Sequence, residues 1–497
     1  MWLVDKMRSK IRSFLQIENN QSNNITLNNL TDYETDCYIN RVWSWGDKAA
    51  IEQLFKQIQT QSDSIRLNFW AATPSMGIVK RHTGLPGIML NTLTDIIISD
   101  MNDITVEPER QNDWNEMCKT MDIEEIISEA VRDVFVSGDG AFRVSIDENI
   151  NKYPIVDFIP GENVEYKYVK GQIREIIFKE YVSHRGKRYH LQEVYGYGYI
   201  RTELYDDDNK VSLKTIPAYK STAPEITFDN SVIMAVPLIF FKSLRYKGRG
   251  KSIFSGKTDS FDSLDEAWSQ WMEALRKGRT KEYIPDMLIP RNPDTGEPIK
   301  PNDFDNSFIA IGDDRSEKGE NKIQREQPAI PHESYLSTYI TALDQCLQGV
   351  ISPSTLGIDV KKLDNAEAQR EKEKTTLYTR NKVVVALQKT LPVLVNTMLK
   401  AYDILTNQPI GDINVDVSFG EYANPSFESQ VETVSKAKSG GIMSIEAAVD
   451  ELYGASKEDE WKAEEVARIK EEQGIATIEE PYINTTAEDF KIGAAEI

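Results

Sequence analysis

The spacing of apolar residues divides the chain into a helical beginning, a strand-rich middle and a helical second half. Apolar positions recur with helical spacing at residues 49–59, 87–99 and 123–136, which predicts three helices. Between residues 141 and 241 the spacing changes to the alternation of half-buried strands, with turn residues between the segments. The predicted strands are residues 142–146, 155–159, 164–168, 173–182, 188–195, 199–205 and 232–241. Helices followed by antiparallel strands indicate an α+β fold.

The second half is predicted to be organised around two helices joined by a loop. The first helix covers residues 333–350, because Leu336, Leu343 and other apolar residues recur on one helical face. It ends before Pro353, which cannot continue a helix. A loop then covers residues 354–363.

The second of these helices is predicted to be very long. Asp364 can cap its first turn, and Glu367 can complete a capping box. The helix continues to residue 405 with Pro392 inside it, and it would span about 60 Å at about 1.5 Å per residue. A helix of this length needs neighbours along it, and a ring of identical subunits would supply them.

Shorter segments are predicted on both sides of this centre. A helix covers residues 260–277, and its stripe includes Trp268 and Trp271, which indicates a core or subunit contact. The remaining predicted segments are a small β-rich insert (283–289, 307–311 and 322–325), a strand (413–422), three acidic helices (426–439, 444–453 and 457–472) and a tail (474–497). The basic amphipathic segment 2–17 is predicted to dock on protein, with a membrane surface as the alternative, and an asparagine-rich linker follows.

Composition indicates a soluble protein from a reducing compartment. The three cysteines, Cys37, Cys118 and Cys346, lie far apart and in no metal-binding spacing. The start of the chain lacks the features of a secretory signal, and the longest apolar run, residues 233–241, is too short to span a bilayer. The net charge of −21 argues against a general nucleic-acid binder. Residues 441–497 alone hold 15 acidic and 5 basic residues.

One segment resembles a phosphate-binding loop. Residues 242–257 carry six basic residues and no acidic one, and Gly250 is followed by Gly256, Lys257 and Thr258. The phosphate-binding motif has four residues between its glycines, whereas five lie between Gly250 and Gly256. We therefore interpret the segment as a flexible basic hinge into the next helix, with a nucleotide-binding enzyme as the alternative. The four histidines are scattered, so we predict no catalytic residue, no metal site and no cofactor.

The order of these segments resembles that of the portal proteins of tailed bacteriophages, especially phages of Gram-positive bacteria. The most similar pieces are residues 250–254 entering a central helix, residues 354–358 before residues 365–368, and residues 440–444 before the late helices. The resemblance implies a ring-forming portal fold with seven parts. These are a wing (1–250), a stem helix (251–282), a β-rich clip (283–330), a second stem helix (331–352), a tunnel loop (353–364), a long kinked helix with a returning wing strand (365–425), and an acidic helical crown with a tail (426–497).

The resemblance also implies a function and a set of partners. A ring, usually of roughly twelve copies, would be assembled in the bacterial cytoplasm and occupy one vertex of the capsid in the virion. It would conduct double-stranded DNA during packaging and ejection. The implied partners are the large terminase subunit, head-completion or adaptor proteins, and the major capsid and scaffolding proteins, with no membrane. The portal itself would not be an enzyme, and the rival reading outside enzymes is a structural adaptor without a channel.

Six basic residues are the candidates for contact with DNA. Lys361 and Lys362 lie in the implied tunnel loop, where they would touch phosphates transiently. Arg276, Lys277, Arg279 and Lys281 form a basic cluster at the end of the first stem helix. This cluster would pair with acidic residues of a neighbouring subunit or touch DNA, and the sequence leaves both open. An acidic wall would repel the duplex and keep it mobile.

Overall fold

The computed structural model describes twelve segments of the chain. They are residues 31–61, 69–73, 77–147, 150–206, 209–220, 222–289, 291–297, 308–312, 322–358, 366–420, 427–453 and 459–472. The chain divides into two compact units, Met1–Gly420 and Glu421–Ile497. Helices and sheets are mixed, which confirms the α+β class. The seven-part division stays a prediction, and the predictions for residues 2–17, 19–29, 359–365 and 474–497 lie outside the described residues.

Among the described residues of the first unit, five helices precede the main strands. They are α2 (Asp32–Trp45), α3 (Lys48–Gln61), α4 (Leu85–Ser99), α5 (Gln111–Met121) and α6 (Ile123–Ser137). The sequence predicted α3, α4 and α6 but missed α2 and α5. A capping box between Thr31 and Glu34 starts α2, and Gly46 ends it in the left-handed conformation. The buried side chains of α2 include Cys37 and Asn40, so it lacks a plain apolar stripe.

Two antiparallel sheets follow these helices. One has the order β10-β2-β3, formed by β2 (Asp139–Ser145), β3 (Ile155–Pro160) and β10 (Ala235–Ile239). The other has the order β4-β5-β6-β7-β8, with β9 paired to β7; its strands are β4 (Val164–Val169), β5 (Gln172–His184), β6 (Lys187–Gly196), β7 (Tyr199–Asp206), β8 (Asn209–Val211) and β9 (Glu225–Thr227). The seven predicted strands are confirmed, while the short edge strands β8 and β9 were missed. The main core includes α6 and β2, where Phe135 and Phe142 are fully buried.

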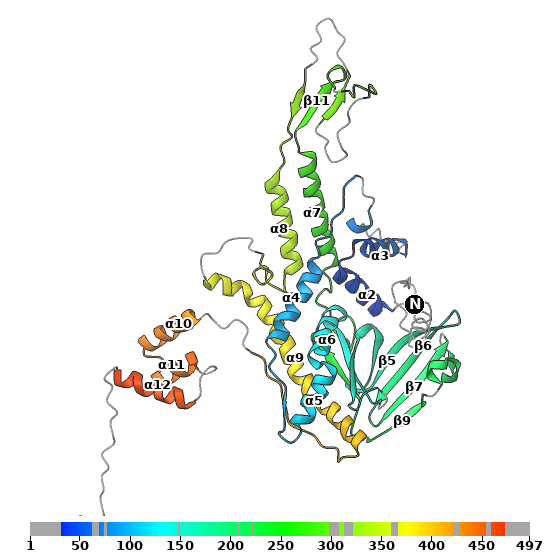
Figure 1. Ribbon diagram of the computed structural model, residues 1–497, viewed down its shortest axis with the longest axis vertical. Helices are drawn as coiled ribbons and strands as arrows, with labels where there is room; N and C mark the ends of the chain where they lie inside the picture. The colour runs from blue at the N-terminus through cyan, green and yellow to red at the C-terminus, as the bar shows by residue number, and fades with distance from the viewer. Residues whose placement is uncertain are drawn as a thin grey trace, which may run out of the picture. The chain divides into compact units, whose positions relative to one another are not determined.

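The second half of the first unit contains a pair of long antiparallel helices with a small sheet at its end. These helices are α7 (Thr258–Lys277) and α8 (His332–Leu347), which lie side by side in Figure 1. The sheet has the order β12-β11-β13 and consists of β11 (Lys281–Pro285), β12 (Phe308–Ile311) and β13 (Gln324–Glu326). The predicted helices and the β-rich insert are therefore confirmed, with boundaries shifted by a few residues.

The long helix α9 (Ala366–Thr406) is one continuous element of 41 residues with Pro392 inside it. Residues 373–406 are long and apolar enough to cross a membrane by composition, but half of that apolar window is buried. Leu387, Leu391 and Met398 are completely buried in the main core, so this stretch serves as a core helix. The strand predicted at 413–422 is shorter than expected, because only β14 (Val415–Asp416) and a bridge at Phe419 pair with other backbone.

The second unit contains three helices, described here by themselves. They are α10 (Phe427–Ser439), α11 (Ile445–Tyr453) and α12 (Asp459–Glu472), at nearly the positions predicted. The rings of Tyr453 and Trp461 lie 5.2 Å apart, edge to face. Lys462 also pairs with Asp450 at 3.0 Å.

Candidate functional site

The helix pair α7–α8 is held together by an aromatic cluster. Trp268 and Trp271 of α7 lie with their ring centroids 5.4 Å and 6.1 Å from the ring of Tyr339 on α8. The two tryptophans therefore join α7 to α8, as their place on the predicted stripe indicated. The outer half of the pair, residues 274–277 and 332–341, is poorly covered, because none of these residues is buried. Leu275 and Leu336 are 43% and 44% exposed.

A second face of α7 fastens the segment that leads into α4. Asp262 accepts hydrogen bonds from the backbone N–H groups of Trp70 and Ala71, at 2.6 Å and 2.9 Å. Asp265 accepts from the backbone N–H of Thr83 at 2.9 Å and lies 2.6 Å from His82 Nδ1. These carboxylates are nearly buried. Burial raises the pKa of Asp262 to about 6.

The predicted basic cluster is partly neutralised within its own chain. Arg276 and Lys277 both lie close to the carboxylate of Glu273, at 3.2 Å and 3.8 Å. Arg279 is exposed, and Lys281 begins β11, where it is the register partner of Glu326. The cluster therefore stands where α7 passes into the small sheet. Contact of these four residues with DNA or a neighbouring subunit remains a prediction.

Lys361 and Lys362 lie outside the described residues, but the first part of the predicted tunnel loop, residues 353–358, is described. The short helix η7 (Pro353–Leu356) begins the loop. Gly357 ends this helix in the left-handed conformation. The hydroxyl of Thr376 on α9 accepts from the backbone N–H of Ser352 at 2.9 Å. The hydroxyl of Thr379 donates to the carbonyl of Val350 at 2.7 Å. The chain therefore enters this loop from a position tied to the first half of α9.

The glycine-rich basic segment is held by hydrogen bonds to other elements of the first unit. Ile253 and Phe254 are buried, and the N–H of Ile253 donates to the carbonyl of Phe135 at 3.1 Å. The N–H of Gly250 donates to Asp139, so these amides do not converge on open space where a phosphate could bind. The Lys257 ammonium donates to the carbonyls of Gln345 and Gln348 at the end of α8. Burial lowers its pKa.

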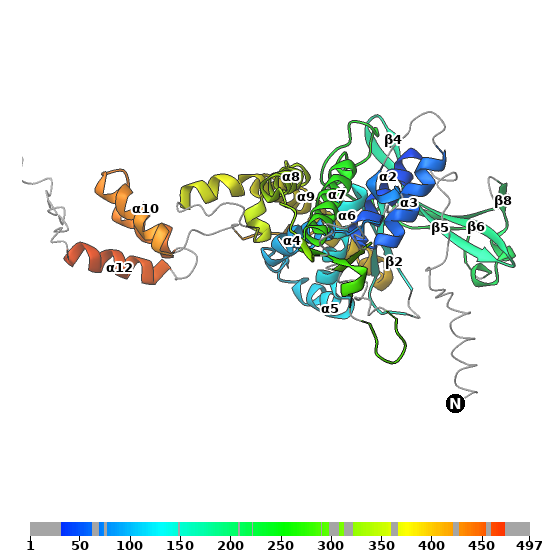
Figure 2. The same cartoon turned by 90° about the horizontal axis from the view of Figure 1, so that it is seen from above.

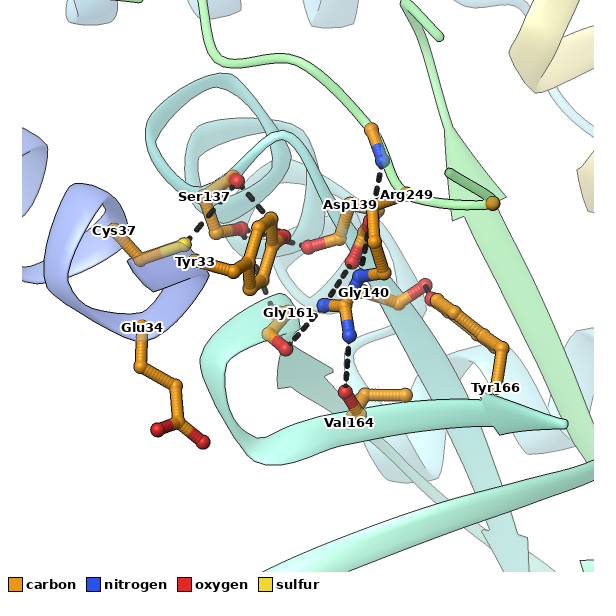
Figure 3. A network of polar contacts seen from close by, with 12 residues as sticks. Tyr33, Glu34, Cys37, Ser137, Asp139, Gly140, Gly161, Val164, Tyr166 and Arg249 are labelled. Carbon is orange, nitrogen blue, oxygen red and sulfur yellow. Dashed lines mark hydrogen bonds and ion pairs between the residues drawn. The ribbon is translucent and has the colours of Figure 1, made fainter. Parts of the chain in front are cut away.

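Arg249 is the anchor that fixes this segment (Figure 3). Its guanidinium forms two hydrogen bonds to the carboxylate of Asp139, at 3.0 Å and 2.8 Å, and also donates to the carbonyls of Gly161 and Val164. The ring of Tyr33 lies 3.9 Å from the guanidinium carbon. Burial alone would lower the pKa of Arg249, but the charge and hydrogen bonds of Asp139, together with Tyr33 and Tyr166, outweigh burial and raise the pKa.

Two glycines allow this close approach. Gly138 has a φ of 100°, a conformation that side chains disfavour, and a Cβ on Gly250 would overlap the carbonyl of Gly138. Residues 137–140 join α6 to β2. They also form the socket for the Arg249 segment, a role that depends on a partner about 110 residues away. Among the described residues, no group of three or more His, Cys, Asp or Glu side chains could hold a metal ion.

Comparisons with known proteins give matches only among solved structures. A scan against protein-family models and a search of curated proteins find no match. One similar structure is described as "Virion of native gene transfer agent (GTA) particle"; it has a TM-score of 0.36 and 12% identity, and the match covers 79% of this chain and 91% of that chain. Another is described as "Neck of native GTA particle computed with C12 symmetry"; it has a TM-score of 0.36 and 11% identity, and the match covers 74% of this chain and 89% of that chain.

Proposed function

We propose that the protein is a portal protein of a tailed bacteriophage, a ring of roughly twelve copies that conducts double-stranded DNA through one vertex of the capsid. The observation that carries the proposal is the poorly covered outer half of the α7–α8 pair. Two helices cover only the seam between them, so the remaining apolar side chains stay exposed in a single chain. Equivalent pairs side by side in a ring would cover Leu275 and Leu336.

The charge of the chain supports passage of DNA rather than storage of it. With a net charge of −21 per copy, a ring repels the phosphate backbone, so the duplex gains little binding energy and stays mobile. Lys361, Lys362 and the Arg276–Lys281 cluster would then provide the few favourable contacts. The ring would occupy the virion after assembly in the bacterial cytoplasm, with the large terminase subunit docked on the small sheet. Adaptor, capsid and scaffolding proteins would contact the remaining surface.

Electron microscopy of the purified full-length protein tests the proposal. We expect annular particles with a central hole wide enough for a DNA duplex. A protein that stays monomeric over a wide range of concentration and salt would overturn the proposal. A particle without a hole would instead favour a structural adaptor.

The proposal also holds that the protein is not an enzyme and that a separate ATPase supplies the energy. The N–H groups of residues 250 and 253 bond to protein acceptors, which supports this part of the proposal. We expect no ATP turnover by the wild type and therefore none to lose in Lys257→Ala. Turnover that disappears in Lys257→Ala would favour the nucleotide-binding alternative.

A further inference from the structure

The loop of residues 242–250 holds an apolar side chain entirely in solvent. Leu244 is 103% exposed, the highest value among the large apolar side chains that the structure describes as exposed. Lys242, Arg245 and Lys247 surround it in sequence, and all three are exposed as well. A leucine loses favourable burial energy in such a position, so a partner that covers it would gain this energy.

The loop is fixed before any partner binds. The backbones of Lys242 and Gly250 form an antiparallel bridge. The Tyr246 hydroxyl donates to Asp36 at 2.7 Å, and the Tyr168 hydroxyl donates to the carbonyl of Gly248 at 2.6 Å. The Arg249 anchor in Figure 3 holds the end of the loop. Because the loop is already ordered, binding costs little conformational entropy.

The same chain carries a surface of opposite charge. Residues 95–129, which include α5 and the first half of α6, contain eleven acidic residues and two basic residues. Three of the carboxylates pair with basic residues from outside this range, namely Glu125 with Arg132, Glu116 with Lys152 and Asp100 with Arg380, so the surface keeps an excess of negative charge. Glu125 and Glu129 lie one turn apart on α6, and both are exposed. Met121 and Ile126 are only partly buried among these carboxylates. The surface therefore offers both negative charge and apolar contact, which suit the lysines and Leu244.

The loop and the acidic surface lie on different sides of the first unit. Tyr246 and Arg245 attach the loop to α2. Figure 2 places α5 on one side of the unit and the α2 and β4 edge on the opposite side. We infer that the 242–250 loop of one copy docks on the α5–α6 surface of a second copy. Such head-to-tail contacts repeat around a closed ring, so this inference rests on the proposed function.

DNA is the rival occupant of a basic loop. Phosphates would pair with Lys242 and Lys247, but they would leave Leu244 exposed to water. The remainder of the acidic chain would also repel the duplex. Both the exposed leucine and the charge of the chain therefore favour a protein surface over nucleic acid.

A charge-exchange cycle on the full-length protein tests the inference, with assembly measured by sedimentation velocity at fixed salt. Lys242→Glu/Lys247→Glu and Glu125→Lys/Glu129→Lys should each raise the concentration for half-maximal ring assembly at least tenfold. Combining all four substitutions should bring it back to within about threefold of wild type, since the charges match again. The control Lys214→Glu/Lys220→Glu reverses two other exposed lysines and should change assembly less than twofold.

A second pair of variants tests the apolar contact. Leu244→Ser should also weaken assembly at least tenfold, because a buried leucine side chain supplies about that factor or more. Ile150→Ser changes another strongly exposed side chain, at 74%, and should leave assembly unchanged. Circular dichroism should show that all variants melt with the wild-type profile, so lost assembly is not lost folding.

A photo-crosslinking residue at position 244 identifies the occupant directly. We expect a product of two copies, with the cross-link mapped within residues 95–129. A cross-link to a DNA duplex, with assembly unaffected by Lys242→Glu/Lys247→Glu, would overturn the inference in favour of nucleic acid. If the wild type forms rings and Leu244→Ser forms them equally well, the inference fails while the proposed function stands. If the wild type forms no ring, the proposed function fails first.

Discussion

The Arg249 anchor and the outer half of the α7–α8 pair differ in one respect: a single chain satisfies the polar groups of the anchor but leaves apolar side chains of the helix pair exposed. The Asp139 carboxylate is fully buried, and the guanidinium beside it has its charge and hydrogen bonds matched within the chain. In the outer helix pair, Leu275 and Leu336 remain more than 40% exposed. Thus a single chain forms the Arg249 anchor completely, whereas the helix pair leaves apolar surface exposed that other molecules can cover.

The largest effect should follow from breaking the anchor. Arg249→Met leaves the buried carboxylate of Asp139 without its cation, so we expect a loss of about 3 to 5 kcal/mol in the free energy of unfolding of the first unit. Urea denaturation measures it. Arg245→Met removes an exposed pair with Asp36 and should cost no more than about 1 kcal/mol. Equal losses in the two variants would contradict the importance of burial at Arg249.

A somewhat smaller loss of stability is expected from a substitution in the buried part of α9. Leu387→Ala creates a cavity at a fully buried position of α9, and we expect a loss of about 2 to 5 kcal/mol. Val385→Ala lies two residues away at 48% exposure, and it should change the stability by less than about 0.5 kcal/mol. Differential scanning fluorimetry compares the two. Similar melting points would show that this part of α9 is not packed as described.

The attachment of α7 to the 69–83 segment should respond to pH. The pKa of Asp262 rises from 3.8 to about 6 on folding, so the folded state binds this proton more tightly than the unfolded state. The cost of burying the charge is therefore present above pH 6 and disappears as the pH falls towards 4. Between pH 7.5 and 4.5, wild type should gain about 2 kcal/mol relative to Asp262→Asn.

Chemical denaturation at several pH values checks this difference. Asp259→Asn, which removes an exposed carboxylate one turn earlier on α7, serves as the control for the loss of one acid group. A constant difference between wild type and Asp262→Asn across the pH range would rule out the raised pKa.

The smallest effect on stability is expected in the outer helix pair. Leu336→Ser replaces a half-exposed side chain, so the free energy of unfolding of the monomer should change by less than about 0.5 kcal/mol. Ring assembly should nevertheless weaken, because the proposed neighbours lose an apolar contact. Denaturation and sedimentation velocity, measured on the same preparation, separate the two effects. A large loss of monomer stability would show that Leu336 contributes to folding instead.

The spacing of apolar residues was sufficient to predict the helices whose buried face is plainly apolar. The stripes through Phe261 and Leu264 on α7 and through Leu387 and Leu391 on α9 predicted both helices, and the structure buries these residues. Helix α2 was missed because its burial includes polar side chains that find distant partners. The amide of Asn40, for example, donates to the carbonyl of Val136.

The site residues were harder to predict than the elements. Asp139 and Arg249 are about 110 residues apart, and Asp262 bonds to amides about 190 residues away. Local spacing contains no information about such partners, since only the fold brings them together. One signal was available: Asp262, Asp265 and Ser269 recur at helical spacing next to an apolar stripe, and buried polar residues in that pattern need partners. Contact of Lys361 and Lys362 with DNA stays a prediction.

The bond from Lys257 to the end of α8 has a mechanical consequence. Its ammonium donates to the carbonyls of Gln345 and Gln348, so it ties the start of α7 to the last turn of α8. The aromatic cluster joins the two helices further along α7, and the Lys257 bonds join them at the start of α7. Because of these two contacts, we expect α7 and α8 to move as one rigid body rather than slide past each other. A force applied to the small sheet would therefore rotate the helix pair about its attachment at the Arg249 socket. Arg249 lies eight residues before Lys257 in the chain. The helix pair is thus built as a lever, and its fixed end is the buried network of Arg249 and Asp139.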